Sequence, residues 1–222
     1  MNDIKSIDDL AGIVESFNKA GKKVILRGQA EDKPLKPQIG REAYCLMAEK
    51  EIFESFKEER LSCCKKVNTD DVSHPKNDYD WLVLAQHYGC KTRCLDWTQW
   101  NDVALFFAVG DAIDKNGVVW IYELPSNNSA EWLCLGHPDL NKSPFQLKEI
   151  KIYHPSLLLD YRPTTQGALL TLHPSPGEPI TMDNRRMFKL KVPADSKKNI
   201  KCDLVNRGIN EARLFGAGEE TL

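Results

Sequence analysis

The sequence lacks any apolar segment long enough to cross a lipid bilayer, and its first residues, MNDIKSIDDL, contain no apolar signal core. It also lacks a CxxC pair. The seven cysteines are an odd number, and Cys63 and Cys64 are adjacent, which is not typical of a disulfide framework. These absences lead us to expect a cytoplasmic protein that makes no contact with a membrane.

Several motifs that identify enzyme and DNA-binding classes are also absent. There is no G-x-S-x-G turn, glycine-rich phosphate loop, HExxH helix or helix-turn-helix signature. The formal net charge of -2 provides no global positive field to attract nucleic acid, although a local basic groove is still compatible with it. His87, Cys90 and Cys94 are close in sequence, but their spacing is not a zinc pattern and no fourth ligand is evident. We therefore expect no metal.

What the sequence does contain is a mixture of helical and strand patterns that predicts an α+β fold. A length of 222 residues suits one domain. We expect a single domain over residues 1–222, with a mixed, mainly antiparallel sheet flanked by helices and a loop insertion at 125–148. The expected helices are 7–20, 41–61, 78–88, 101–109 and 198–205, and the expected strands are 23–26, 92–95, 117–124, 149–153, 168–172 and 187–192.

The segment 85–108 is the strongest candidate for a functional site. It places His87, Arg93 and Asp96 inside a stretch that otherwise has the composition of a core. A polar side chain that loses its water on folding must find a partner or costs about 1 to 3 kcal/mol. A second candidate is the polar triplet RGQ at 27–29, which follows an expected strand.

Four segments of the chain resemble the FRG domain family in order and spacing. They are LRGQ at 26–29, AQHYGCKTRCLDWTQWNDVALFFAV at 85–109, RPTTQGALLTLHP at 162–174 and GINEARLF at 208–215. The family is known as a domain of bacteria and phages that is often linked with mobile elements. The resemblance implies a fold, whereas the family name by itself implies no reaction.

The chain also resembles ADP-ribosyltransferases in the order of its elements. Those enzymes place an arginine or histidine with a glycine on a first strand, followed by two helices, a strand that enters a further helix, and a glutamate on a later strand. Here Arg27 and Gly28 match the first strand, and the expected strand near 92–98 leads into the helix around 104–108. This resemblance implies a fold of that type and NAD as a substrate.

The resemblance to ADP-ribosyltransferases implies roles for the binding candidates. Arg27 would pair with the diphosphate of NAD, and Gly28 would let the backbone approach the ligand closely. Tyr88 or Trp97 would stack on nicotinamide or adenine. The remaining binding candidates are Gln29, His87, Arg93 and Arg162.

The catalytic carboxylate has three candidates under the same resemblance. Cleavage of the nicotinamide–ribose bond builds oxocarbenium-like charge, which a nearby carboxylate stabilises. The expected strand offers Gln166, which carries no charge. Glu211 is the second candidate, although its position favours the first turn of a helix, and Asp96 is the third.

Three functions stay open on the sequence alone. The first is an NAD-cleaving or ADP-ribosyl-transferring enzyme, such as a toxin or phage-conflict effector, with an unknown protein or nucleic-acid acceptor. It requires that Arg27, Arg93 and Asp96 converge on one cavity. The second is a nucleic-acid-directed module or nuclease that uses Arg27, His87, Arg93 and Arg162 on phosphates. The third is a non-catalytic protein-interaction domain, in which the same polar cluster only holds the loop conformation and a partner protein binds elsewhere. A separate structural alternative for Arg93 and Asp96 is a buried ion pair that fixes the strand-to-helix turn.

Overall fold

The computed structural model describes residues 3–67, 75–126, 129, 131–133, 137–154, 168–180 and 186–215, which form one seven-stranded sheet in the order β4-β5-β6-β2-β1-β3-β7. Neighbouring strands are antiparallel except β4 and β5, which are parallel. The expected α+β class with a mixed, mainly antiparallel sheet is confirmed. The strands are β1 (Val24–Gln29), β2 (Cys94–Thr98), β3 (Gly117–Glu123), β4 (Trp132–Leu133), β5 (Lys151–Tyr153), β6 (Ala168–Leu172) and β7 (Met187–Val192).

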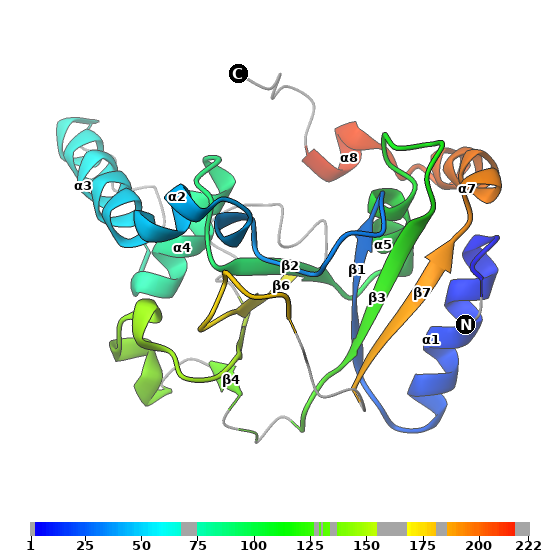
Figure 1. Cartoon of the computed structure of the whole chain (residues 1–222), viewed down its shortest axis with the longest axis horizontal. Coiled ribbons are helices and arrows are strands. Elements are labelled where there is room, and N and C mark those ends of the chain that lie inside the picture. Colours follow the sequence, from blue (N-terminus) through cyan, green and yellow to red (C-terminus); the bar gives the residue numbers. More distant parts are fainter. Residues whose placement is uncertain are drawn as a thin grey trace.

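Helices lie around both ends of this sheet (Figure 1). Those at one end are α2 (Ala43–Met47), α3 (Glu49–Val67) and α4 (Asp78–His87). Those at the other end are α1 (Ile7–Lys19), α5 (Asn101–Ala108), α7 (Ala194–Asn206) and α8 (Glu211–Phe215). Short 3-10 helices are η1 (Gln38–Arg41), η2 (Pro138–Asn141) and η3 (Pro144–Gln146).

Local sequence sets the ends of α1 as predicted. The Ser6 side chain accepts a hydrogen bond from the backbone N–H of Asp9, and the Asp9 carboxylate accepts one from the backbone N–H of Ser6. This capping box satisfies two N–H groups that the helix itself leaves free. Beyond the other end, Gly21 has a φ of 71°, a backbone conformation that favours glycine.

The single helix expected over 41–61 is wrong in its first part. The chain forms η1, α2 and α3 in succession, and extended backbone at Glu42, with φ -128° and ψ 119°, separates the first two. A Cβ atom on Gly40 would lie 1.7 Å from the carbonyl oxygen of Pro176. Close packing against that loop therefore overrides the helical composition of this segment.

Two further boundaries differ from the sequence-based expectation. The strand expected at 92–95 lies at Cys94–Thr98, where every residue pairs with β6. The last long helix begins at Ala194, directly after Pro193, instead of at residue 198. Proline before a helix is compatible with its start because no N–H is required there. The expected insertion at 125–148 includes β4, η2 and η3 among its described residues.

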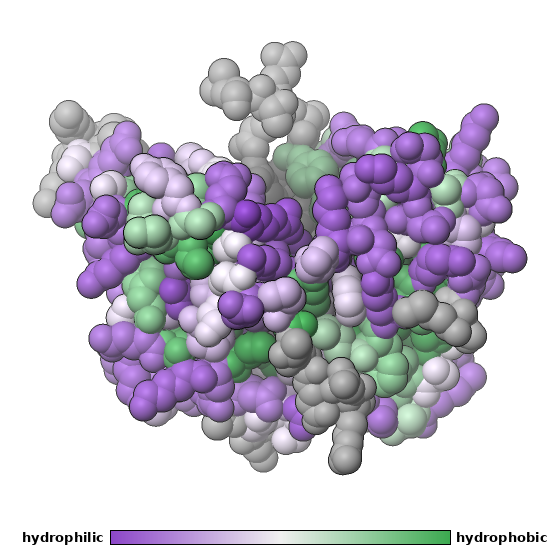
Figure 2. All heavy atoms as spheres, viewed as in Figure 1, coloured by the Kyte–Doolittle hydropathy of each residue, from purple (hydrophilic) through white to green (hydrophobic). Residues whose placement is uncertain are grey.

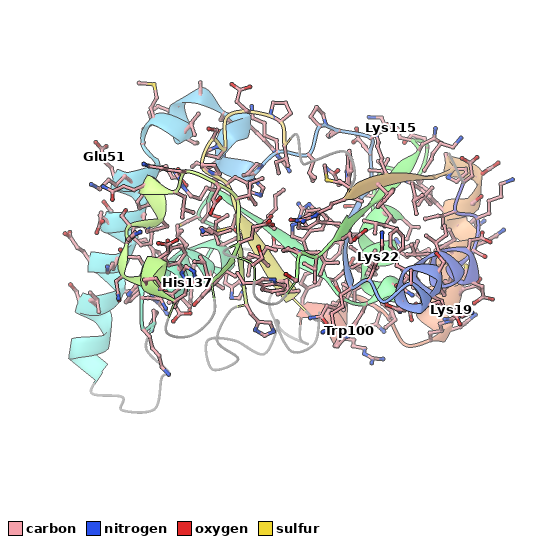
Figure 3. All side chains as sticks on the ribbon, turned by 90° about the horizontal axis from the view of Figure 1, so that it is seen from below. Lys19, Lys22, Glu51, Trp100, Lys115 and His137 are labelled. Carbon is pink, nitrogen blue, oxygen red and sulfur yellow. The ribbon has the colours of Figure 1, made fainter. Side chains whose placement is uncertain are left out.

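The sheet divides into two halves at β1 and β2. These strands pair only at Leu26 and Thr98, and in Figure 1 β2 runs across the view whereas β1 stands upright. One hydrophobic cluster joins α1, α5 and α7 to β1, β3 and β7, and a second joins α3 and α4 to β2, β5 and β6. Figure 3 shows Glu51 and His137 at one end of the molecule and Lys19 and Lys22 at the other.

The surface follows the same division. The face in Figure 2 carries hydrophilic side chains over both ends, and its hydrophobic side chains gather nearer the middle. A third hydrophobic cluster, which includes Ile25, Leu95 and Trp97, covers the face of the sheet opposite α4 and α5. The junction between the two halves of the sheet is therefore covered on both faces, by α4 and α5 on one face and by the third hydrophobic cluster on the other.

Candidate functional site

A cavity of about 290 Å³ lies where the two halves of the sheet meet. Residues from β1, β2, β6, α4, α5 and α8 enclose it, and we call it the Arg27 cavity. Its lining residues are Leu26, Arg27, Gly28, Val83, Gln86, His87, Asp96, Trp97, Thr98, Val103, Phe107, Ala168, Leu170 and Phe215. Most of this wall is apolar, and the charged side chains in it are those of Arg27 and Asp96.

Arg27 spans the gap that opens where β1 and β2 separate. Its NH1 atom donates a 2.6 Å hydrogen bond to the backbone carbonyl oxygen of Asp96 and lies 3.9 Å from the Oδ2 atom of the Asp96 carboxylate. The Arg27 side chain is 19% exposed, whereas that of Asp96 is 56% exposed. Burial lowers the pKa of Arg27, and the negative charge of Asp96 opposes this shift.

One hydrogen-bond donor of Arg27, the Nε–H group, forms no hydrogen bond with any residue that the structure describes. The Nε atom is buried. A buried donor without a partner costs about 1 to 3 kcal/mol, and more when it carries charge. An acceptor supplied by a ligand in the cavity would satisfy this atom.

The Asp96 carboxylate is held from the opposite wall by Gln86. The Nε2 atom of Gln86 donates a 2.6 Å hydrogen bond to the Oδ1 atom of Asp96. The Oε1 atom of Gln86 accepts a hydrogen bond from the hydroxyl of Thr92. A fixed array therefore leads from the buried Thr92 through Gln86 and Asp96 to Arg27, and the last three of these residues line the cavity.

The structure brings five of the predicted site residues to this cavity, and they are Arg27, Gly28, His87, Asp96 and Trp97. The indole of Trp97 is only 2% exposed, and its Nε1 atom donates a 2.8 Å hydrogen bond to the hydroxyl of Thr171. Trp97 is therefore part of the core and offers little ring surface for stacking on a ligand.

Gly28 meets a need that differs from the predicted one. A Cβ atom here would lie 1.9 Å from the carbonyl oxygen of Ala104 and 2.7 Å from the backbone nitrogen of Ala108. The absence of a side chain thus lets the backbone of α5 cross β1 at close range. The predicted role of Gly28 is to let the protein backbone approach a ligand closely. Gly28 does line the cavity, and the close approach that the structure describes there is to the backbone of α5.

Arg93 lies outside the Arg27 cavity, which corrects two expectations. Its guanidinium forms a two-point ion pair with the carboxylate of Glu49, through Nε–Oε1 at 3.0 Å and NH2–Oε2 at 2.6 Å. Its NH1 atom donates to the carbonyl oxygens of Pro144 and His173, at 3.2 and 3.5 Å. The predicted Arg93–Asp96 ion pair is wrong, because Glu49 from α3 provides the carboxylate and Asp96 is exposed.

Three other candidates also lie away from this cavity. The amide of Gln29 accepts a 2.6 Å hydrogen bond from the indole of Trp120. Tyr88 is exposed, and the guanidinium of Arg60 stacks on its ring at 4.1 Å. Glu211 begins α8 and lines a different hollow between α5, α7 and α8. Arg162 and Gln166 lie outside the described residues.

Sequence reasoning missed the apolar wall and Gln86. Phe107 and Phe215 line the cavity with ring centroids 6.2 Å apart, and no periodicity of the sequence indicated that α8 would reach α5. Gln86 did carry a signal, because it is polar and lies in the last turn of a helix whose Val83 and Ala85 are buried.

A buried histidine next to the cavity gives a prediction about pH. The hydroxyl of Thr171 accepts from Trp97, so its own proton is available to the Nε2 atom of His173 at 2.8 Å, which requires a neutral ring. Burial lowers the pKa of His173 to about 3, and the positive charges of Arg27 and Arg93 act in the same direction. The unfolded chain, in which histidine titrates near 6.5, therefore binds the proton first as the pH falls.

We expect the free energy of unfolding to fall by about 2 kcal/mol between pH 7.5 and pH 5 because of His173. The measurement is urea denaturation across this range for the wild type and for His173→Gln, which lacks the titrating ring. The variant should lose correspondingly less stability over the same range. Equal slopes for the wild type and His173→Gln would contradict the assignment.

Two absences concern metals and membranes. Among residues 3–67, 75–126 and the other described ranges, no group of three or more His, Cys, Asp or Glu side chains is placed to hold a metal ion. No helix in the described part of the chain has the length and apolar character needed to cross a membrane.

Comparison with known proteins identifies a family for part of the chain. Residues 22–117 match the model of the FRG domain, which confirms the resemblance to that family. The matched region includes Arg27, Gln86 and Asp96, and the lining residues outside it are Ala168, Leu170 and Phe215. No curated protein and no solved structure matches the chain, so the resemblance to ADP-ribosyltransferases is not confirmed.

Proposed function

We propose that this protein, which carries an FRG domain, cleaves NAD and transfers the ADP-ribosyl group, and that NAD binds in the Arg27 cavity. The observation that carries the proposal is the buried Nε donor of Arg27, which has no partner within the described residues and lies in a cavity that also contains a carboxylate. The convergence of Arg27, Arg93 and Asp96 on one cavity, which the sequence analysis required of this function, fails at Arg93, because Glu49 holds its guanidinium. The proposal is therefore kept only for a site built from Arg27 and Asp96, which do share the cavity.

The proposed binding mode uses both parts of the wall. A guanidinium is opposite in charge to the phosphate oxygens and fits their geometry with two parallel N–H groups, so Arg27 is placed to hold the diphosphate. The apolar wall that includes Val83, Val103 and Phe107 suits the flat nicotinamide ring. A volume of about 290 Å³ is at the small end of ligand pockets, which favours entry of the nicotinamide end, with the adenosine end outside.

The proposed reaction breaks the bond between the ribose C1′ atom and the nicotinamide nitrogen. The bonding electron pair leaves with nicotinamide, and positive charge develops on the ribose. The Asp96 carboxylate, whose Oδ1 atom is held by Gln86, stabilises this charge. Water, or a nucleophile of a protein or nucleic-acid acceptor, then bonds to C1′ and releases a proton. Such a reaction would serve a toxin or phage-conflict effector.

The test is nicotinamide release from NAD by the purified protein, alone and with cell extract or nucleic acid. We expect Arg27→Ala to reduce release by at least about 100-fold, since it removes the donor for the diphosphate. Arg27→Lys should recover only part of the rate, because an ammonium group keeps the charge but loses the planar fork. Circular dichroism establishes that each variant is folded.

The matched control is Arg207→Ala. The Arg207 side chain is 49% exposed and pairs with the exposed Asp8, so its loss should leave nicotinamide release unchanged. Wild-type release that survives in Arg27→Ala would contradict the assignment of Arg27. No release by the wild type, together with no thermal shift on addition of NAD, would contradict the proposed function. Salt-sensitive binding to DNA or RNA would then support a nucleic-acid-directed module, although Arg93 is already occupied by Glu49.

A further inference from the structure

Gln86 is not among the site residues predicted from the sequence, and in the proposed reaction it contacts only Asp96. It lies in the last turn of α4, and its two amide atoms connect Thr92, at the start of the segment leading into β2, with Asp96 within β2. The Thr92 side chain is buried, whereas the Asp96 carboxylate reaches the cavity. The array therefore connects a fixed point in the core to a carboxylate at the site.

The direction of each hydrogen bond follows from the donors available. The hydroxyl of Thr92 accepts from the backbone N–H of Cys94 at 3.3 Å, which leaves its own proton for the Oε1 atom of Gln86. With Oε1 used in this way, the NH₂ group of Gln86 faces Asp96 and donates to Oδ1 at 2.6 Å. Oδ2, which lies 3.9 Å from the NH1 atom of Arg27, is the carboxylate oxygen that is not bonded to Gln86.

We propose that Gln86 is a positioning residue that fixes the orientation of the Asp96 carboxylate in the Arg27 cavity, and that Thr92 sets the orientation of the Gln86 amide. The consequence for NAD cleavage rests on the proposed function, whereas the orientation itself does not. Gln86 contacts Asp96 and needs no contact with the reacting atoms. An amide suits this role because its NH₂ group donates a hydrogen bond and carries no charge that titrates.

Replacement of Gln86 by glutamate provides a readout that a purely structural role would not change. The shape is nearly the same, but a second carboxyl group then lies at hydrogen-bond distance from Asp96. Two carboxyl groups at this distance do not both ionise easily, so the pair retains one proton and shares it. The other charged or titratable groups that line the cavity are Arg27 of β1 and His87 of α4, and both are present in every variant.

The kinetic test measures kcat, KM and the pH profile of NAD cleavage. We expect Gln86→Leu to lower kcat by about 10- to 100-fold while KM changes less than threefold, because the carboxylate is misoriented and diphosphate binding is kept. Gln86→Glu should move the acid limb of the profile to higher pH by at least one unit. Thr92→Val should resemble Gln86→Leu. Gln99→Leu, at an exposed position outside the array, is the control and should leave both kinetic constants unchanged.

A second measurement needs no NAD. In the wild type, NMR should show the side-chain amide of Gln86 shifted and protected from solvent exchange, and both effects should be lost in Thr92→Val and in Asp96→Asn. An unprotected amide in the wild type would overturn the inference. Unchanged kcat and pH profile in Gln86→Leu and Gln86→Glu would overturn it while leaving the proposed function intact. Absence of NAD cleavage by the wild type with a protected amide would overturn the proposed function and leave the orientation of Asp96 supported.

Discussion

Gly28→Ala is expected to destabilise the fold by at least about 3 kcal/mol, because the added Cβ would lie 1.9 Å from the carbonyl oxygen of Ala104. Neither atom can turn away, since the oxygen belongs to the backbone of α5 and the position of the Cβ atom is fixed by the backbone of β1. Relief of the clash requires α5 to move off the sheet, and the cluster of buried side chains around Val103, Ala104 and Leu105 moves with it. The measurement is the urea unfolding midpoint of the variant against the wild type.

Gly12→Ala is the matched control for this substitution. Gly12 lies within α1, and a Cβ atom there would meet nothing within 4 Å. Alanine in the interior of an exposed helix stabilises by about 0.5 to 1 kcal/mol relative to glycine, so the same chemical change should act in the opposite direction. An unchanged midpoint for Gly28→Ala would show that α5 does not cross β1 as closely as described.

The two residues of the arginine–glycine pair thus have different roles. Gly28 brings α5 against β1, which places Val103 and Phe107 in the wall of the cavity. Arg27 contributes the charged group at the point where β1 separates from β2. The main effect of mutating Gly28 should therefore be a loss of stability, whereas the main effect of mutating Arg27 should be a loss of ligand binding in a protein that still folds.

Much of the fold could be predicted from the sequence because its signals are local. The strands β3, β6 and β7 match their expected positions to within a residue, since each is a β-branched or apolar run bounded by turn residues. The break at Glu42, between η1 and α2, could not be predicted, because it lies beside Gly40, which packs against Pro176, far away in sequence. The pairing of β1 with β2 at a single position could not be predicted either, because no local pattern in the sequence encodes it.

The candidate site could be predicted only in part, because the sequence indicates which polar side chains need a partner but not which residues provide it. Polar residues in an apolar stretch indicated His87, Arg93 and Asp96, and two of the three line the Arg27 cavity. The pattern shows that a polar side chain needs a partner, but it does not identify that partner. Arg93 finds Glu49 from α3, while Asp96 finds Gln86 and Arg27. Partners from separate elements are settled only by tertiary structure.

Arg93→Leu is expected to lower the free energy of unfolding by about 3 to 5 kcal/mol, because it leaves the Glu49 carboxylate buried without a counter-charge. The side chains of Arg93 and Glu49 are only 8% and 6% exposed. Arg93 also joins η3 to the end of β6 through the carbonyl oxygens of Pro144 and His173. Urea denaturation of this variant, of Glu49→Leu and of the double variant gives the coupling energy between the two side chains.

The double variant and Arg93→Lys together test whether the role of Arg93 is structural or functional. An apolar pair of similar volume removes both charges at once, so the double variant should be more stable than Arg93→Leu alone. Arg207→Ala, which removes an exposed arginine, should cost less than about 1 kcal/mol. Arg93→Lys should be less stable than the wild type, because lysine cannot make the two-point contact with Glu49. If Arg93→Lys instead kept full stability and lost NAD binding, Arg93 would belong to the ligand site, and the assignment of the cavity to Arg27 and Asp96 would be incomplete.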